Sequence, residues 1–299
     1  MCFSSAPIWV ICAANLVCGF GDTPLGAQPS PREVRAGPAT LAQILEHLSQ
    51  ESDDFRQIAP ATLSEETLEQ RSRPNEPNAQ FQTHEVISEY GFAALASAPN
   101  AIHEVRKVIS VDGKPVMALE KARQAMTLSL KSSDDKLKKR LLEDFERHGL
   151  RGAATDFGQL ILLFSARRIK DYDFQIRGER QIGADRLVVV SYTQKSGDTG
   201  VTVFVGNAAK REPLHGEISF RKKDLVPLRI TMTASQTVKE VAIKEESTVD
   251  YKLDPAGSVL PVSVVHREFV QGELLSENTF TYAPFRKVLA GAGLKLPRL

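Results

Sequence analysis

The sequence predicts an α+β fold, in which a large curved antiparallel sheet, a half-barrel, is covered on one face by about three to four helices. Two observations predict it. From Tyr172 onward, apolar and polar residues alternate with a period of two, and short turns separate the runs. The helical patterns all come earlier in the chain. Because strand follows strand through short turns, we expect a meander with one apolar and one solvated face.

The strands are clearest in the last third of the chain. In Leu228–Ala234, for example, Leu228, Ile230 and Met232 alternate with polar residues. The expected strands are Tyr172–Arg177, Arg186–Thr193, Val201–Val205, Gly216–Arg221, Leu228–Ala234, Thr248–Leu253, Val259–Phe269 and Ser276–Tyr282. Turn residues such as Asp254–Gly257 and Gln271–Glu273 lie between them.

Helical spacing of apolar residues predicts the covering elements. Thr40 is a plausible N-cap for a helix within Ala39–Ile58. Three further helices are expected at Met117–Leu130, Asp134–His148 and Thr155–Ala166. The last contains a continuous apolar run, Leu160–Phe164, which predicts the most buried helix.

Two segments before these helices have different patterns. Glu85–Ala94 and Ile102–Val111 are apolar and are followed by the turn Asp112-Gly113, which predicts a β-hairpin. By contrast, Pro60–Asn78 is polar and contains Pro74 and Pro77, so we expect a mobile connection with at most a short helix at Ser64–Arg71.

The N-terminus resembles an export signal. An uncharged apolar segment, Ala6–Phe20, is followed by Leu25-Gly26-Ala27, which predicts a signal peptide cleaved near Ala27 and a periplasmic or secreted mature protein. All three cysteines, Cys2, Cys12 and Cys18, lie in the expected signal peptide, and Cys18 leaves lipidation open as an alternative. The expected organisation is residues 1–27 as signal peptide, 28–82 as linker and helix, 83–285 as one domain and 286–299 as a tail.

Composition and charge exclude some classes of partner. The 299 residues are 42% hydrophobic and 25% charged, with a net charge of +1, and basic and acidic residues are interleaved. Because a phosphate backbone needs a basic patch, we expect no nucleic-acid partner. We expect a monomer.

No motif indicates catalysis, a metal or a cofactor. His84-Glu85 and His103-Glu104 lie on the strands of the expected hairpin, but neither has a second histidine at metal-binding spacing, so they are interpreted as polar residues of a solvated face. His266-Arg267-Glu268 is interpreted as a strand end that enters solvent. Gly291-Ala292-Gly293 lacks the third glycine of a dinucleotide site.

The strongest candidate for function is the apolar sheet face, a default site for a small molecule or a lipid. The residues expected to line it are Ile218, Phe220, Leu228, Ile230, Met232, Val249, Tyr251 and Leu253. They predict an exported, non-catalytic binding protein for lipid, acyl chains or a lipidated peptide. A protein-interaction or scaffold module of the cell envelope, and a hydrolase of unrecognised type, stay open as alternatives.

Several short segments carry a resemblance. Ser88–Tyr90, Arg106–Val108, Val111–Val116, Leu228–Ile230, Val249–Tyr251, Leu260–Val262 and Asn278–Phe280 resemble segments of an uncharacterised family of secreted proteins of soil bacteria, such as acidobacteria. More distantly, the signal peptide, early helix and succession of strands are similar to the periplasmic lipoprotein-carrier (outer-membrane lipoprotein-sorting) superfamily. That second resemblance implies a half-barrel that holds acyl chains under a helical lid.

Overall fold

The computed structural model describes residues 39–74, 79–96, 98–146, 148, 156–195, 201–205, 208–238 and 240–288. The expected signal peptide and Gly291–Gly293 lie outside these residues. No helix within the described residues is long and apolar enough to cross a membrane.

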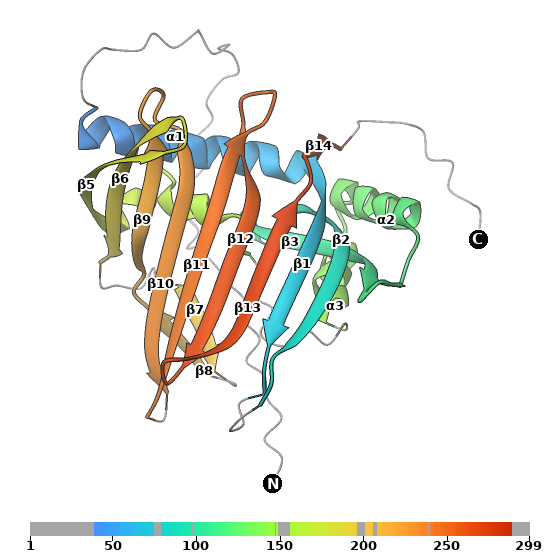
Figure 1. Cartoon of the computed structure of the whole chain (residues 1–299). Helices are drawn as coiled ribbons and strands as arrows, with labels where there is room; N and C mark the ends of the chain where they lie inside the picture. The colour runs from blue at the N-terminus through green and yellow to red at the C-terminus, as the bar shows by residue number, and fades with distance from the viewer. Residues whose placement is uncertain are drawn as a thin grey trace.

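A sheet of 12 antiparallel strands dominates the molecule (Figure 1). Its order is β4-β3-β2-β1-β13-β12-β11-β10-β9-β6-β5, and β14 pairs with β1. The bounds are β1 Thr62–Ser72, β2 Gln82–Leu95, β3 Ala98–Val111, β4 Lys114–Pro115, β5 Tyr172–Ile182, β6 Asp185–Gln194, β9 His215–Arg221, β10 Pro227–Val238, β11 Val241–Leu253, β12 Val259–Val270, β13 Glu273–Tyr282 and β14 Arg286–Lys287. A separate hairpin contains β7 (Val201–Val205) and β8 (Ala208–Glu212). The expected antiparallel sheet is therefore confirmed.

The expectation for Pro60–Asn78 is wrong. Instead of a mobile connection with a short helix at Ser64–Arg71, this part of the chain contains β1, which pairs with β2 on one side and β13 on the other. The sheet also continues beyond Phe285 into β14. One sheet therefore includes β1, which precedes Thr83, and β14, which follows Phe285.

The turns have the backbone that their residues favour. Asp112 and Gly113 have φ of 49° and 71°, and Gln271 and Gly272 have φ of 51° and 86°. Two consecutive positive φ angles are typical of the tight hairpin turn whose twist matches that of the strands. The turn between β3 and β4 and the turn between β12 and β13 thus follow directly from Asp-Gly and Gln-Gly.

Helix α1 (Leu41–Ile58) covers the inner face of the sheet. Thr40 is its N-cap: the Gln43 N–H donates to the Thr40 hydroxyl, and the Gln43 side chain accepts from the Thr40 N–H. Figure 1 shows α1 crossing behind the strands. Its residues Ile44, Leu48 and Phe55 belong to the same buried cluster as the inner face.

Beside α1 lies η2 (Leu160–Phe164), where the sequence predicted a full helix. This part of the prediction is wrong in length, because the element is a single short 3₁₀ segment that ends at Ser165. Its apolar run is buried as expected, with Leu160, Ile161 and Phe164 in the cluster under α1.

The other two helices lie on the outer face, which corrects the expectation that all helices share one face. α2 (Leu119–Lys131) and α3 (Asp135–Glu146) pack against β2 and β3. Their Met126 and Leu141 form a second cluster with Ala93 and Val105. Those strand residues alternate with the inner-face residues Phe92 and Glu104, so they point to the other side of the sheet.

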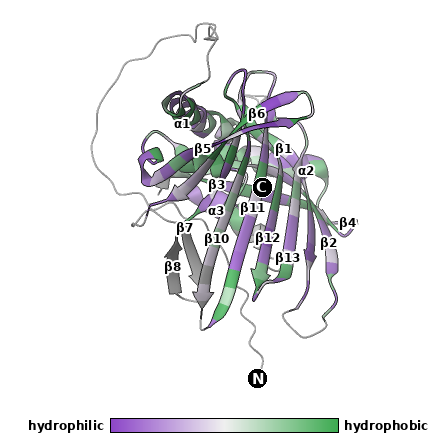
Figure 2. Ribbon diagram, turned by 60° about the vertical axis from the view of Figure 1, so that its left-hand side comes forward, coloured by the Kyte–Doolittle hydropathy of each residue, from purple (hydrophilic) through white to green (hydrophobic). Residues whose placement is uncertain are grey.

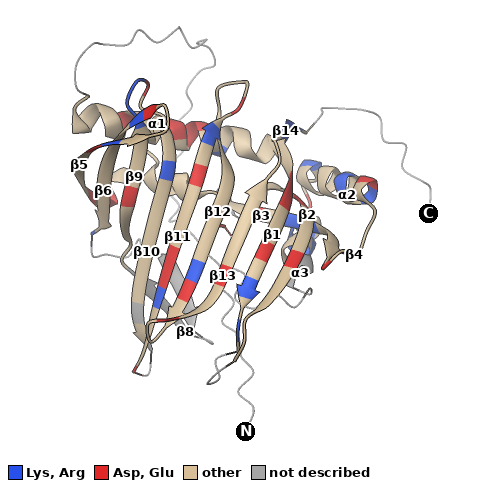
Figure 3. Cartoon of the chain, viewed as in Figure 1, with Lys and Arg blue, Asp and Glu red and all other residues tan. Residues whose placement is uncertain are grey.

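Hydrophobic and hydrophilic residues both occur along the central strands (Figure 2). Acidic and basic residues are spread over β1, β11 and β12 (Figure 3). Several are paired, as in Arg229–Asp250 and Arg267–Glu277. The outer face of these strands is therefore a solvated surface of mixed charge, and the inner face contains the core.

Candidate functional site

The inner face of β9, β10 and β11 is the apolar surface expected from the sequence. Ile218, Phe220 and Ile230 are fully buried there, as is Val249, and Met232 and Tyr251 are 2% exposed. Cross-strand register joins them, for example Ile230 with both Ile218 and Val249. We call Ile218, Phe220, Ile230, Met232, Val249 and Tyr251 the apolar wall.

Two of the eight expected lining residues lie differently. Leu228 is half-buried and packs against the edge of the cluster. Leu253 is 37% exposed, so it is not part of the apolar wall. It is the last residue of β11, immediately before the turn Asp254–Gly257, and lies beyond the elements that cover the wall.

Tyr251 connects the apolar wall to the segment that covers it. Its hydroxyl donates to the Gly158 carbonyl at 3.1 Å and accepts from the Ile161 N–H at 3.2 Å. Both backbone groups are buried, and an unpaired buried group is costly. A single side chain of the sheet therefore holds η2 in place over the wall.

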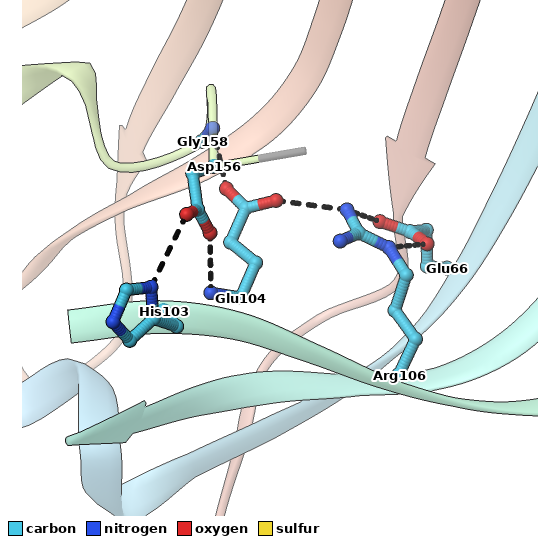
Figure 4. A network of polar contacts seen from close by, with 6 residues as sticks. All are labelled: Glu66, His103, Glu104, Arg106, Asp156 and Gly158. Carbon is cyan, nitrogen blue, oxygen red and sulfur yellow. Dashed lines mark hydrogen bonds and ion pairs between the residues drawn. The ribbon is translucent and has the colours of Figure 1, made fainter. Parts of the chain in front are cut away.

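A buried ionic network adjoins the wall on β1 and β3 (Figure 4). Arg106 donates to both carboxylate oxygens of Glu66, at 2.6 and 2.8 Å, and to Glu104 at 2.8 Å. None of the three side chains is more than 3% exposed. The Arg106 guanidinium also lies 5.0 Å from the ring centre of Tyr90 and 5.2 Å from that of Phe280. A fully paired cation therefore sits among aromatic rings on the inner face.

The same network fixes the segment that leads into η2. Glu104 accepts from the Gly158 N–H at 2.6 Å, and its own N–H donates to Asp156 at 2.7 Å. Asp156 also contacts His103 Nδ1 at 3.4 Å. Since the N–H of an edge strand needs a partner, Asp156 both covers the free edge of β3 and holds the segment against it.

Burial shifts the protonation of this network. It raises the pKa of Glu104 to about 7, against the opposing effect of Arg106. The hydrogen bond with Asp156 raises the pKa of His103, although burial lowers it. The network therefore changes its charge within the range around neutral pH.

A second polar group of residues lies on the inner face at the other end of the apolar wall. We call it the polar ladder; its members are Gln70, Glu245, Ser247, His266, Glu268, Ser276 and Asn278, all less than 9% exposed. The register places Glu245 opposite Glu268, and Ser247 opposite His266. His266 and Glu268 therefore do not enter solvent, which corrects the interpretation of His266-Arg267-Glu268; only Arg267 points outward, as alternation predicted.

Part of the ladder is paired. Gln70 Nε2 donates to Asn278 Oδ1 at 2.7 Å, and the Asn278 amide lies 3.4 Å from His266 Nδ1. Phe157 stacks on the His266 ring at 4.6 Å. By contrast, Glu245 Oε1, Ser247 Oγ and His266 Nε2 are buried without a hydrogen-bond partner. Unpaired buried polar atoms are uncommon in proteins, and they require an explanation.

The histidines weighed in the sequence do not converge. His84 is on the surface and pairs with Asp112 at 3.0 Å. His103 lies opposite Ala93, nine positions along β2 from His84, a separation of about 30 Å at the rise of a strand. In the described part of the chain, no three His, Cys, Asp or Glu side chains are placed to hold a metal ion.

No protein-family model and no curated protein sequence matches the chain. Among solved structures, a LolA superfamily protein from Nitrosomonas europaea is 10% identical, with 85% of this chain and 94% of that chain covered and a TM-score of 0.33. An outer membrane lipoprotein-sorting protein domain from Vibrio parahaemolyticus is 11% identical, with 84% and 93% covered and a TM-score of 0.34. A DUF1329 family protein from Desulfovibrio piger is 12% identical, with 84% and 95% covered and a TM-score of 0.30.

The structural comparison finds these three proteins at TM-scores of 0.30 to 0.34. At these scores and identities it transfers neither a ligand nor a residue role to this chain.

Proposed function

We propose that the mature protein is an exported, non-catalytic binding protein of the cell envelope, which holds an acyl chain or a similarly long apolar group against the apolar wall. The observation that carries the proposal is the wall itself. Its six side chains come from three neighbouring strands and present apolar surface toward α1 and η2. Each square ångström of apolar surface removed from water contributes about 25 cal/mol, so a flexible chain gains affinity from contact area alone.

The way the wall is covered supports the same function. η2 is a short segment held by the Tyr251 hydroxyl and, through Gly158, by Glu104. To move away from the wall, this segment would break these few hydrogen bonds and expose its buried residues Leu160, Ile161 and Phe164, whereas every strand of the wall is paired on both sides. A ligand would enter between the wall and this cover.

Co-purification tests the proposal. The mature chain is purified without detergent from a bacterial envelope, native mass spectrometry measures any bound mass, and displacement of a fluorescent fatty acid measures binding. We expect bound lipid and saturable displacement. No bound mass together with no displacement would retire the proposal, and pull-down for an envelope protein partner would become the next experiment.

A pair of variants locates the site. Val249→Trp places a bulky ring on the apolar wall and should weaken binding of the fluorescent fatty acid. Lys252→Trp adds the same ring to the exposed outer face of the same strand and should leave binding unchanged. Equal binding by both variants, each with an unchanged circular dichroism spectrum, would place the ligand elsewhere.

A further inference from the structure

We propose that the polar ladder is a subsite for a primary ammonium group. This inference deepens the proposed function, because the ammonium group would be the head of an amphiphile whose chain lies on the apolar wall. The residues that would contact it are Glu245, Glu268 and Ser247.

Two carboxyl groups form the centre of the subsite. Glu245 of β11 and Glu268 of β12 are directly opposite each other in the antiparallel register and share the inner face. Opposite residues in such a pair have Cβ atoms about 5 Å apart, so one cation can contact both carboxyl groups. Both residues are buried, at 8% and 6% exposure.

An unpartnered hydroxyl lies next to the two acids. Ser247 is two residues from Glu245 on the same face, is 2% exposed, and its Oγ has no hydrogen-bond partner. Glu245 Oε1 is also unpaired. An ammonium group carries three donors, and Glu245, Glu268 and Ser247 supply three acceptors on one face.

The described residues around the two acids supply no compensating charge. On the inner face their neighbours are Ala234 of β10, Ser276 of β13 and His266. The charged residues beside them in sequence, Lys244, Glu246 and Arg267, alternate to the outer face. Among the described residues no cation contacts either carboxyl group, whereas the Arg106 network shows that this protein pairs its other buried acids.

The pKa shifts of Glu245, Glu268 and His266 agree with a binding site for a cation. Burial and the neighbouring Glu268 raise the pKa of Glu245 to about 8, and burial raises that of Glu268. Burial also lowers the pKa of His266 to about 3, so the imidazole stays neutral and does not repel a positive charge. Without a ligand, Glu245 keeps its proton at neutral pH, and an arriving ammonium group would displace that proton.

The subsite is continuous with the apolar wall. Ser247 lies opposite Met232 of the wall, and Val249 of the wall is the next inner residue of the same strand. Ala234, Ser247 and Ser276 are small, so the side chains around the acids take up little space. An amphiphile with its head on the ladder would therefore direct its chain along the wall.

Chain-matched probes test the inference at pH 6.5 by calorimetry. Dodecylamine should bind about 10- to 100-fold more tightly than dodecanol, because a hydrogen bond to a charged group contributes about 1.5–3 kcal/mol. Dodecyltrimethylammonium, a cation without N–H donors, should lose most of that advantage. Equal affinity of the amine and the alcohol would overturn the subsite while leaving the proposed function standing.

Variants assign the effect to the ladder. Glu245→Gln and Glu268→Gln should each reduce the preference for dodecylamine about tenfold and leave dodecanol binding unchanged. Glu246→Gln, an acid of the outer face on the same strand, is the matched control and should change neither. An unchanged preference in the double variant Glu245→Gln/Glu268→Gln would contradict the proposal.

Two further readouts separate the subsite from the proposed function. Butylamine, which has almost no chain to fill the wall, should still bind weakly if the subsite exists, even if dodecanol does not bind at all. Measured in buffers of different ionisation enthalpy, amine binding should release close to one proton in wild type and none in Glu245→Gln. Absence of proton release in wild type would count against the role of Glu245.

Discussion

Among single residues, Arg106 is the cation that pairs with two buried carboxyl groups at once, those of Glu66 and Glu104. Replacing it by Met keeps the volume but leaves two buried carboxyl groups without a cation. Loss of one partner from a buried ion pair costs about 3–5 kcal/mol. We therefore expect Arg106→Met to lower the free energy of unfolding in urea by about that amount.

The matched control is Arg267→Met. Arg267 also pairs with a glutamate, Glu277, but its side chain is 44% exposed on the outer face. Exposed pairs contribute about 0–1 kcal/mol. If the two variants unfolded at similar urea concentrations, Arg106 would not be the cation on which the buried carboxyl groups depend.

Glu245 predicts how stability changes with pH. Its pKa is about 8 in the folded protein and near 4.5 ordinarily. Between these values the unfolded chain has lost the proton and the folded chain keeps it, so stability falls as pH rises, by about 3 kcal/mol from pH 4.5 to pH 7. Glu245→Gln should remove most of this decline.

Urea unfolding at pH 5 and pH 7.5 measures the effect. Glu245→Gln should be more stable than wild type at pH 7.5 and similar to it at pH 5. The outer-face variant Glu246→Gln should keep the wild-type pH dependence. Parallel curves for wild type and Glu245→Gln would show that Glu245 ionises in the folded protein much as it does in the unfolded chain.

For whole strands, the alternation of β10 makes the sharpest prediction. Ile230 is fully buried and Arg229 is on the outer face. Ile230→Ala should reduce the free energy of unfolding by about 2–5 kcal/mol, as large-to-small core changes do. Arg229→Ala should cost at most about 1 kcal/mol. Equal effects in urea would mean that the register is shifted by one residue.

A second prediction at the scale of an element concerns how the Tyr251 hydroxyl holds η2 against the sheet. Tyr251→Phe keeps the ring but removes the hydroxyl that serves Gly158 and Ile161, so it should cost about 1–3 kcal/mol and speed hydrogen exchange at the Ile161 amide. Tyr192→Phe is the control, since its hydroxyl donates to Thr231 within the sheet. Unchanged exchange at Ile161 in Tyr251→Phe would show that other contacts hold η2.

Strands and helices could be predicted where one face is apolar. The five strands from β9 to β13 and the helices α1, α2 and α3 follow directly from that pattern. β1 could not, because its inward residues Ser64, Glu66 and Gln70 are polar and hide the alternation. Its polar side chains are satisfied by partners far away in sequence, such as Arg106 and Asn278.

The candidate site shows the same limit. The six residues of the apolar wall were predictable from apolar alternation alone. The ionic network and the polar ladder could not be predicted, because the sequence alone does not distinguish a buried glutamate from an exposed one. The one available signal was the position of His266 and Glu268 on the apolar side of the β12 pattern, between Val264 and Val270.

At the scale of the whole molecule, the exposed edge of the sheet at β5 carries charged side chains. β5 is the last strand of the sheet and carries Arg177, Glu179 and Arg180, with an irregularity in pairing between Ile176 and Gly178. Charges and bulges on an edge strand oppose pairing with another chain. We expect light scattering coupled to size exclusion to find a monomer.

Replacing Glu179 and Arg180 together by valine removes that protection and should produce concentration-dependent association. The exposed Ile176 and Ile182 on the same strand would then join a longer apolar edge. A wild-type dimer, or a double variant that stays monomeric at all concentrations, would show that the charges do not guard this edge.

The position of β1 between β2 and β13 has a consequence for how the chain folds. Ser64 donates a hydrogen bond to the Ala283 carbonyl, 219 positions later, so the middle of the sheet joins the two ends of the chain. During synthesis, β1 can pair with β2 early, but its second partner, β13, is made after all the other long strands, and such distant pairing is slow. A chain interrupted before β13 would have two unpaired strand edges, those of β1 and β12. Unpaired edges recruit other chains, so the incomplete chain would aggregate rather than fold into a smaller domain.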